Sequence, residues 1–373
     1  MIYDVTIIGG GIHGAACAQL CADAGYKVLV LEQYEKPGLG TSSKSSKLIH
    51  GGLRYLETGQ FKLVRECLQE REYLLKTYPK LVQLVPFHIP VYQHTGRSAW
   101  MIRLGLIIYS LFSGKSFTTI KKSRWQELDN LKTDQLKTVF QYYDAQTNDQ
   151  LLTQAVMADA QELGATVLTG TRFKRAECDD MECRIDYQHK NQLLQAQSKL
   201  IINTSGPWAN HVLRNIQPRS TMPDIELVLG THIVVSRPLL KGMYYLESPT
   251  DHRAVFVMPW QNNTLIGTTE TPFEDTPDKV APPQSDIDYL MNVYNQYFTD
   301  AITQADIIDS FAGLRVLPAA SGSHFSRPRE TIIHHDNTQS PRVFSLYGGK
   351  LTAHRATARQ LLRSIKPLLQ ASE

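Results

Sequence analysis

Residues 4–32 read DVTIIGGGIHGAACAQLCADAGYKVLVLE, and this stretch decides the fold of the first part of the chain. Residues 4–8 are a short β-branched run, which favours a strand. An alanine-rich stretch follows a glycine turn and ends at Gly25, which is typical of a helix. Residues 27–31 are a second β-branched run. Together these segments predict a βαβ unit.

The turn of this unit carries the pattern Gly9-x-Gly11-x-x-Gly14, the fingerprint of a dinucleotide-binding site. These glycines permit a tight turn, a close approach of backbone to a pyrophosphate and close packing of helix on strand. Free N–H groups at the start of the helix favour phosphate charge. Glu32, 18 residues after Gly14, is placed to accept hydrogen bonds from an adenosine ribose. The pattern fits both FAD and NAD.

The chain has 373 residues, which indicates two domains at about 150 residues each. Hydrophobic residues make up 42% of it, and 39 Lys and Arg against 36 Asp and Glu leave a net charge of +3. This composition excludes collagen-like and disordered chains, and the charge argues against a nucleic-acid partner. An anionic ligand must therefore be bound by a local cluster of cations.

The five cysteines show no CxxC pairing of the metal-binding kind, and we expect reduced thiols of a cytoplasmic protein. No basic region precedes the first strand, so we expect no signal peptide. Residues 100–112 (WMIRLGLIIYSLF) are too few to span a bilayer and include Arg103. They predict either a buried core segment or an amphipathic element at a membrane surface, with Lys115, Lys121 and Lys122 just beyond.

The second half of the chain has a different pattern of predicted elements. Short β-rich runs at 226–237, 254–260 and 264–269 are separated by turns, which predicts an antiparallel sheet. Further on, residues 343–346 predict a strand, the glycines at 348–349 a tight turn, and the remaining residues a helix.

Seven blocks of sequence carry a resemblance to a known family. They are SSKLIHGGLRYLE (45–57), NTSGPWA (203–209), GTHIVV (230–235), VFVMPW (255–260), LIGTTE (265–270), AGLRVLP (312–318) and LYGGKLTAHR (346–355). In this order they resemble the FAD-dependent, aerobic-type glycerol-3-phosphate dehydrogenase family of the D-amino-acid-oxidase-like flavoprotein superfamily. Because the chain ends at Glu373, we expect it to lack the C-terminal helical domain of longer members.

The resemblance implies an α/β fold in which a Rossmann-like FAD-binding domain is interleaved with a substrate domain of antiparallel β-sheet plus helices. Residues 1–84, 144–212 and 305–373 would form the discontinuous FAD-binding domain. Residues 85–143 and 213–304 would form the substrate domain. The short strands predicted in the second half agree with this division.

The resemblance also implies the activity. The family oxidises sn-glycerol 3-phosphate to dihydroxyacetone phosphate by hydride transfer from C2 to non-covalently bound FAD, and passes the electrons to a quinone. Such a protein would be cytoplasmic, or peripheral on the cytoplasmic face of the inner membrane. Related oxidases use oxygen instead, and the oligomeric state stays open.

By resemblance, the substrate site contains Arg54, Tyr55, Arg315, Arg329 and Lys350; Arg327 competes with Arg329 for its position. Arginine suits this role because its planar fork pairs two phosphate oxygens. The expected FAD site consists of Gly9, Gly11, Ile12, His13, Gly14, Glu32, Gln33, Thr41, Ser42, Ser43, Lys47, Leu48, Ile49, His50, Gly206, Trp208, Gly313, Arg315, Gly348, Gly349, Lys350, Leu351 and Thr352. We expect no metal site, since His334 and His335 lack further ligands.

The expected catalytic residues are Arg315, His232 and His50, and the proton acceptor among them stays open. Imidazole titrates near neutral pH, which favours a histidine, whereas arginine keeps its proton. Two alternatives to the whole function remain. One is a related FAD oxidoreductase that acts on another 2-hydroxy acid or an amino acid, and the other is a flavin-binding protein without catalysis.

Overall fold

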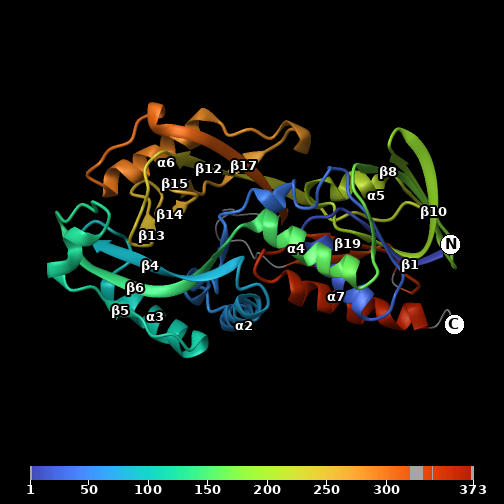
Figure 1. The fold of residues 1–373 in the computed structure, drawn as a ribbon, viewed down its shortest axis with the longest axis horizontal. Helices are drawn as coiled ribbons and strands as arrows, with labels where there is room; N and C mark the ends of the chain where they lie inside the picture. Colours follow the sequence, from blue (N-terminus) through green and yellow to red (C-terminus); the bar gives the residue numbers. More distant parts are fainter. Residues whose placement is uncertain (1, 320–330, 338, 371–373) are drawn as a thin grey trace.

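Two β-sheets follow one another along the longest axis of the molecule, and helices cover them (Figure 1). The computed structural model describes residues 2–319, 331–337 and 339–370. Both marked chain ends lie at the same end of the molecule, beside the first sheet (Figure 1). This mixed architecture confirms the predicted α/β fold with an interleaved antiparallel part.

Within the described residues, the first sheet has nine strands, and β1 (Ile2–Ile8) lies between β2 (Val28–Leu31) and β10 (Gln192–Asn203). β1 pairs in parallel with both, and β10 also pairs in parallel with β19 (Val343–Tyr347). The carboxyl ends of these four strands therefore meet at one edge. The other strands of this sheet are β7 (Thr166–Leu168), β8 (Thr171–Cys178), β9 (Cys183–His189), β11 (Ile216–Gln217) and β18 (Ile332–His335).

Helix α1 (Ile12–Asp23) packs between this sheet and two further helices, α4 (Asp149–Glu162) and α7 (His354–Gln370). Its alanines are almost fully buried, and a side chain of one methyl lets the helices and the sheet approach closely. The opposite face of the sheet carries the short helix α5 (Ala209–Arg214). The predicted βαβ unit thus holds the centre of the sheet.

The second sheet has ten strands within the described part of the chain, and all its pairings are antiparallel except that of β13 with β4. Its strands are β3 (Leu48–Ile49), β4 (Val82–Tyr92), β5 (Thr118–Thr119), β6 (Leu136–Thr147), β12 (Ile225–Val235), β13 (Met243–Glu247), β14 (Ala254–Trp260), β15 (Asn263–Gly267), β16 (Thr271–Phe273) and β17 (Ile307–Pro318). The antiparallel sheet expected in the second half is confirmed. This sheet also includes strands from the first half of the chain.

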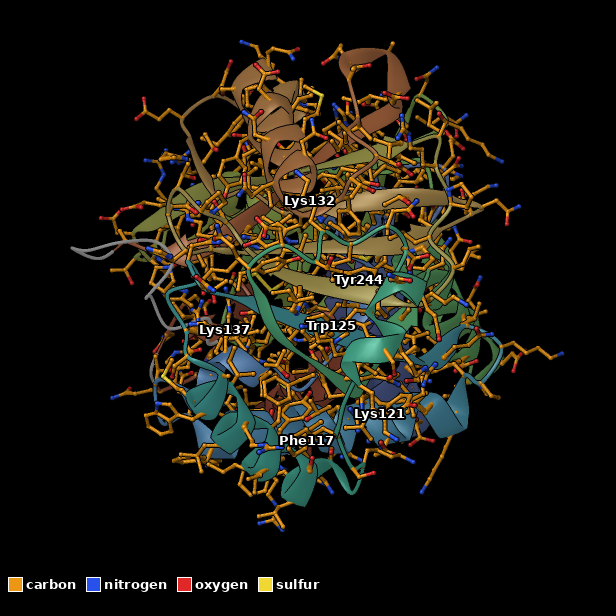
Figure 2. All side chains as sticks on the ribbon, turned by 90° about the vertical axis from the view of Figure 1, so that its left-hand side faces the viewer. Phe117, Lys121, Trp125, Lys132, Lys137 and Tyr244 are labelled. Carbon is orange, nitrogen blue, oxygen red and sulfur yellow. A yellow bond between two sulfur atoms is a disulfide. The ribbon has the colours of Figure 1, made fainter. Side chains whose placement is uncertain are left out.

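Helices cover both faces of this sheet. Helix α6 (Gln284–Tyr297) packs on one face, and α2 (Phe61–Thr77) and α3 (Ala99–Ser113) pack on the other. Figure 2 views this end of the molecule and labels Trp125 and Tyr244, two members of the core beneath α6. The described 3₁₀ helices span Thr41–Ser43, Leu53–Leu56, Lys122–Glu127, Gly206–Trp208, Pro277–Lys279 and Gln304–Asp306.

The chain passes repeatedly between the two sheets. It leaves the first sheet after β2, returns at β7, leaves again after β11 and returns at β18. β17 pairs with β12 in the second sheet, although its residues fall in the predicted 305–373 segment of the FAD-binding domain. Pairing within a sheet does not by itself define a domain, so the predicted domain boundaries stay a prediction.

The apolar segment 100–112 forms most of α3 and is neither fully buried nor fully exposed. Leu106, Tyr109 and Ser113 face the core, whereas the opposite side exposes a row of large apolar side chains. The exposed row consists of Trp100, Met101, Leu104, Ile107, Leu111 and Phe112. We call this row the α3 face. Among the described residues, no helix has the length and apolar character needed to cross a bilayer.

The expectation of five reduced thiols is wrong for one pair. Cys178 at the end of β8 and Cys183 at the start of β9 form a disulfide. The two residues are direct partners across the antiparallel pairing of these strands, with their Cα atoms 4.0 Å apart, so the hairpin brings the thiols together. Cys17, Cys21 and Cys67 are free and buried.

A thiol count tests this pairing. In denaturant without reductant we expect the three free thiols of Cys17, Cys21 and Cys67 to react with a thiol dye, and all five cysteines to react after reduction. The variant Cys178→Ser should give the same count under both conditions, because Cys183 then has no partner in its hairpin. Five reactive thiols in the unreduced parent protein would contradict the disulfide.

Candidate functional site

A cavity of about 1180 Å³ begins at the edge where the carboxyl ends of the parallel strands meet. Ile8, Leu31 and Thr204, at or just beyond the ends of β1, β2 and β10, border it on one side. Strands β12 and β17 of the second sheet border it on the other side. In open α/β sheets, ligands bind outside the carboxyl ends of the strands, and this cavity has that location.

The glycine turn between β1 and α1 leaves no room for side chains. Gly9 has φ +103°, and a Cβ on Gly14 would lie 1.9 Å from the carbonyl oxygen of Gly9. The hydroxyl of Thr204 donates to the same carbonyl over 2.9 Å, which joins the end of β10 to the turn. The start of α1 is thereby held against the cavity.

Glu32 at the end of β2 is 5% exposed and organises the other side of this turn. One of its carboxylate oxygens accepts from the N–H of Gly10 over 2.5 Å, and the other accepts from the N–H of Tyr34 over 2.8 Å. Burial raises the pKa of Glu32, and the backbone donors offset part of that increase. The carboxylate lines the cavity where a ribose would have to bind.

The serine-rich segment 41–47 is fixed from both sides. Ser42 Oγ accepts from the N–H of Ile12 over 2.9 Å, and so ties the segment to the start of α1. Lys47 does not line the cavity, and its ammonium donates instead to Asp149 over 2.7 Å. Asp149 also accepts from the hydroxyl of Ser45 over 2.7 Å. The segment is therefore an ordered wall of the cavity.

At the far end of the cavity, His232 on β12 is buried and stacks on Phe311, with ring centroids 5.0 Å apart. Its Nε2 lies 2.9 Å from the hydroxyl of Ser46. Burial lowers the pKa of His232 far below its ordinary value, and the nearby charges of Arg315 and Lys47 act in the same direction. The imidazole is therefore neutral at physiological pH and can accept the Ser46 proton in a hydrogen bond.

Arg315 on β17 lines the same end of the cavity. Its guanidinium donates to Glu270 over 2.9 Å and to the hydroxyl of Thr268 over 3.4 Å. The Lys350 ammonium lies 4.0 Å from the ring centroid of Tyr55, and both of these residues also line the cavity. Cationic and aromatic groups from three separate parts of the chain thus line one cavity.

Two buried polar atoms indicate that the cavity takes a polar ligand. Neither His13 Nε2 nor Lys350 Nζ has a hydrogen-bond partner within the described residues, and both side chains border the cavity. A buried polar group without a partner costs about 1–3 kcal/mol, which a ligand with acceptor atoms would offset. Together with the start of α1 and with Glu32, these residues fit a dinucleotide such as FAD.

The structure places most of the predicted site residues on one cavity. Those that line it are Gly9, Gly11, Ile12, His13, Glu32, Gln33, Thr41, Ser42, Leu48, His50, Tyr55, Gly206, Trp208, His232, Gly313, Arg315, Gly348, Gly349, Lys350, Leu351 and Thr352. Those that do not are Gly14, Ser43, Lys47, Ile49 and Arg54. Arg54 is adjacent, with its guanidinium 5.2 Å from the ring centroid of Tyr55. Arg329, like Arg327, lies outside the described residues.

Several lining residues are absent from the prediction. Ser45 and Ser46 belong to the serine-rich segment, and Thr204 and Ser205 follow β10 directly. A residue just after a parallel strand lies at the ligand-binding edge, so the strand ends alone could have identified the second pair. The Asp149 carboxylate that anchors Lys47 carries no such signal in the sequence.

Comparison with known proteins finds relatives that match nearly the whole chain. A family model described as FAD dependent oxidoreductase, DAO, matches residues 4–361. Aerobic glycerol-3-phosphate dehydrogenase of Escherichia coli (strain K12) is 35% identical over 98% of this chain and 74% of its own length. D-erythritol 1-phosphate dehydrogenase of Brucella abortus (strain 2308) is 33% identical over 97% of this chain and 73% of its own length.

Solved structures share the fold. The glycerol-3-phosphate dehydrogenase of Bacillus halodurans in complex with FAD superimposes with a TM-score of 0.80 at 23% identity. The match covers 99% of this chain and 65% of that longer chain. Reduced L-alpha-glycerophosphate oxidase of Mycoplasma pneumoniae, with FAD bound, gives a TM-score of 0.79 at 18% identity, covering 98% of this chain and 95% of its own.

Gly14 offers a test of the dinucleotide end. In Gly14→Ala the new methyl must displace the Gly9 carbonyl, and overpacking of this kind costs about 1–3 kcal/mol, so we expect FAD to bind at least ~5-fold more weakly. Titration of the apoprotein with FAD measures this. The matched variant is Gly105→Ala in α3, where a Cβ meets nothing nearer than 3.9 Å. Equal FAD affinity in the two variants would refute the role given to the turn.

Proposed function

The chain belongs to the DAO family of FAD-dependent oxidoreductases, and on this basis we propose that it oxidises sn-glycerol 3-phosphate to dihydroxyacetone phosphate. Relatives named glycerol-3-phosphate dehydrogenase are up to 35% identical to it over nearly its whole length. The observation that carries the proposal is that Arg315, Lys350, His50 and His232 all line the cavity that begins at the glycine turn. A small phosphorylated alcohol needs such a set of groups.

FAD, when bound, supplies the acceptor for the C2 hydride. The protein holds the FAD and excludes other reactions. The N–H groups at the start of α1 and the Glu32 carboxylate suit the pyrophosphate and the adenosine ribose. The segment 41–47, anchored by Lys47 and Asp149, closes the cavity beside them.

Arg315 and Lys350 are the groups we assign to the substrate phosphate. Glu270 orients the Arg315 guanidinium, which offers a planar fork of donors to phosphate oxygens. Arg54, beside Tyr55, and Arg329 remain further proposed phosphate ligands.

The C2 hydroxyl must lose its proton as C2 loses hydride, and we assign the proton to His50. His232 is the weaker acceptor, because its pKa lies far below the ordinary value and its Nε2 is engaged by Ser46. The Arg315 guanidinium keeps its proton at physiological pH and serves to stabilise negative charge. The backbone N–H of His50 donates to the Thr352 hydroxyl over 3.2 Å, which holds the residue against the segment that follows the glycines at 348–349.

D-erythritol 1-phosphate is the second candidate substrate, because the Brucella relative that carries this name matches the chain as extensively as the glycerol-3-phosphate dehydrogenases do. Both compounds present a phosphate and an adjacent polyol. The two proposals therefore share the phosphate ligands and the proton acceptor, and they differ only in the length of polyol that the cavity admits.

We further propose that the electrons pass to a quinone at a membrane surface that the α3 face contacts. Large apolar side chains on one side of a helix, with a tryptophan at its start, are typical of interfacial helices. Phe61 extends this face and lies edge-on to Phe112. Phe117 and Lys121, which Figure 2 labels, follow α3 in the chain, and Lys121 and Lys122 are exposed. Exposed lysines favour anionic lipid.

Anaerobic titration of the holoprotein tests the reaction. Glycerol 3-phosphate should bleach the flavin absorbance, and Arg315→Ala should raise the KM about 10- to 100-fold, as expected for one lost charge-assisted contact. Arg124→Ala removes an exposed ion pair to Glu127 and should leave the KM unchanged. Bleaching by D-erythritol 1-phosphate alone would select the second substrate. Bleaching by an amino acid but neither phosphate would overturn the proposal.

Vesicle binding tests the membrane contact. Leu111 is 77% exposed on the α3 face, and Leu240 is 78% exposed in the turn between β12 and β13. Burial of a leucine is worth about 1.5–3 kcal/mol, so Leu111→Glu should weaken co-sedimentation with phosphatidylglycerol-containing vesicles at least ~10-fold. Leu240→Glu is the matched control and should bind as the parent does. Equal losses in both variants would indicate a general charge effect instead of a docking face.

A further inference from the structure

The loop between β3 and α2 carries three of the proposed substrate-site residues. His50 and Tyr55 line the cavity, and Arg54 lies beside Tyr55. Its backbone is closely packed at Gly51, where an added Cβ would lie 2.5 Å from the Tyr109 hydroxyl and 2.6 Å from Leu68. The position of this loop therefore depends on what lies behind Gly51.

A buried polar chain lies directly behind it. The N–H of Gly51 donates to the Tyr109 hydroxyl over 2.9 Å, and that hydroxyl donates to one oxygen of Asp144 over 2.6 Å. The other oxygen of Asp144 accepts from Arg71 over 2.7 Å. Tyr109, Asp144 and Arg71 are each at most 2% exposed. Water cannot replace these bonds without opening the core.

The three side chains come from three different elements. Tyr109 lies on the buried side of α3, Asp144 on β6 and Arg71 on α2. Arg71 offsets the buried charge of Asp144, and the carboxylate orients the Tyr109 hydroxyl so that its lone pairs face Gly51. Burial raises the pKa of Tyr109 well above its ordinary value, so the hydroxyl keeps its proton and stays a donor to Asp144.

We propose that Tyr109 is a positioning residue for the reaction: its hydroxyl, oriented by Asp144 and Arg71, fixes Gly51 and thereby sets His50 and the following substrate-site residues against the cavity. The inference rests on the proposed function only for the identity of the substrate. A second anchor holds the other end of the loop, where Arg97 donates to both carboxylate oxygens of Glu57 over 2.6 and 3.2 Å. With both ends held, the loop has a defined position before substrate binds.

Tyr109→Phe tests the inference, because it removes the hydroxyl and keeps the ring. We expect the KM for glycerol 3-phosphate to rise ~10-fold, as for the loss of one buried hydrogen bond, with unchanged FAD content. We also expect kcat to fall, because His50, the assigned proton acceptor, moves with Gly51. The matched control is Tyr92→Phe. Tyr92 is 3% exposed, and its hydroxyl donates to the Lys132 carbonyl over 2.6 Å in the core beneath α6. This variant should lose comparable stability and keep the parental KM.

Amide exchange at Gly51 gives a readout that is independent of turnover. Its N–H should exchange faster in Tyr109→Phe than in the parent holoprotein or in Tyr92→Phe. With an active parent, a KM within twofold of the parental value in Tyr109→Phe overturns the inference. If the parent does not oxidise glycerol 3-phosphate, the proposed function fails and exchange alone decides. Faster exchange at Gly51 then supports the positioning role, and unchanged exchange overturns it.

Discussion

The close approach of a strand to a helix at one glycine turn is the constraint on which the rest of the site depends. Gly14 must lack a side chain because the Gly9 carbonyl occupies the space, and Thr204 binds that same carbonyl. The turn thus joins β1, α1 and the end of β10 in one place. Glu32, Ser42 and the cavity are arranged around it. A wider turn would separate the amide groups from the carboxylate.

The charge of the molecule acts locally. The net charge of +3 is small, yet Arg315 and Lys350 both line the cavity, and Lys47 lies behind its wall. Burial is the main cause of the lowered pKa of His232, and the charges of Arg315 and Lys47 act in the same direction. A local group of cations is also what a nearly neutral protein needs in order to bind an anion. Glu270 pairs with Arg315 and Asp149 pairs with Lys47, so each of these two cations has a carboxylate that offsets part of its charge.

The site residues that follow from local spacing can be predicted from the sequence. Those that depend on contacts between distant residues cannot. The glycine pattern and Glu32 lie within one βαβ unit, so their positions could be predicted. Ser46 and His232 are 186 positions apart, and Lys47 and Asp149 are 102 apart. No periodicity connects such pairs, and only the folded chain brings them together. Most of the predicted site residues within the described part of the chain line the cavity, but the prediction included neither Tyr109 nor Asp144 behind the loop.

The order of strands in the first sheet has a consequence for synthesis on the ribosome. β1 is synthesised first, but one of its two neighbours is β10, which ends at residue 203. β10 pairs in turn with β19, which is synthesised only at residues 343–347. At about 5–20 residues per second, one edge of β1 stays open for roughly 10–40 seconds while β10 is translated. During that interval the nascent chain presents an unpaired apolar strand. An interleaved fold therefore leaves this strand edge open to wrong pairing for longer than a fold of consecutive domains would.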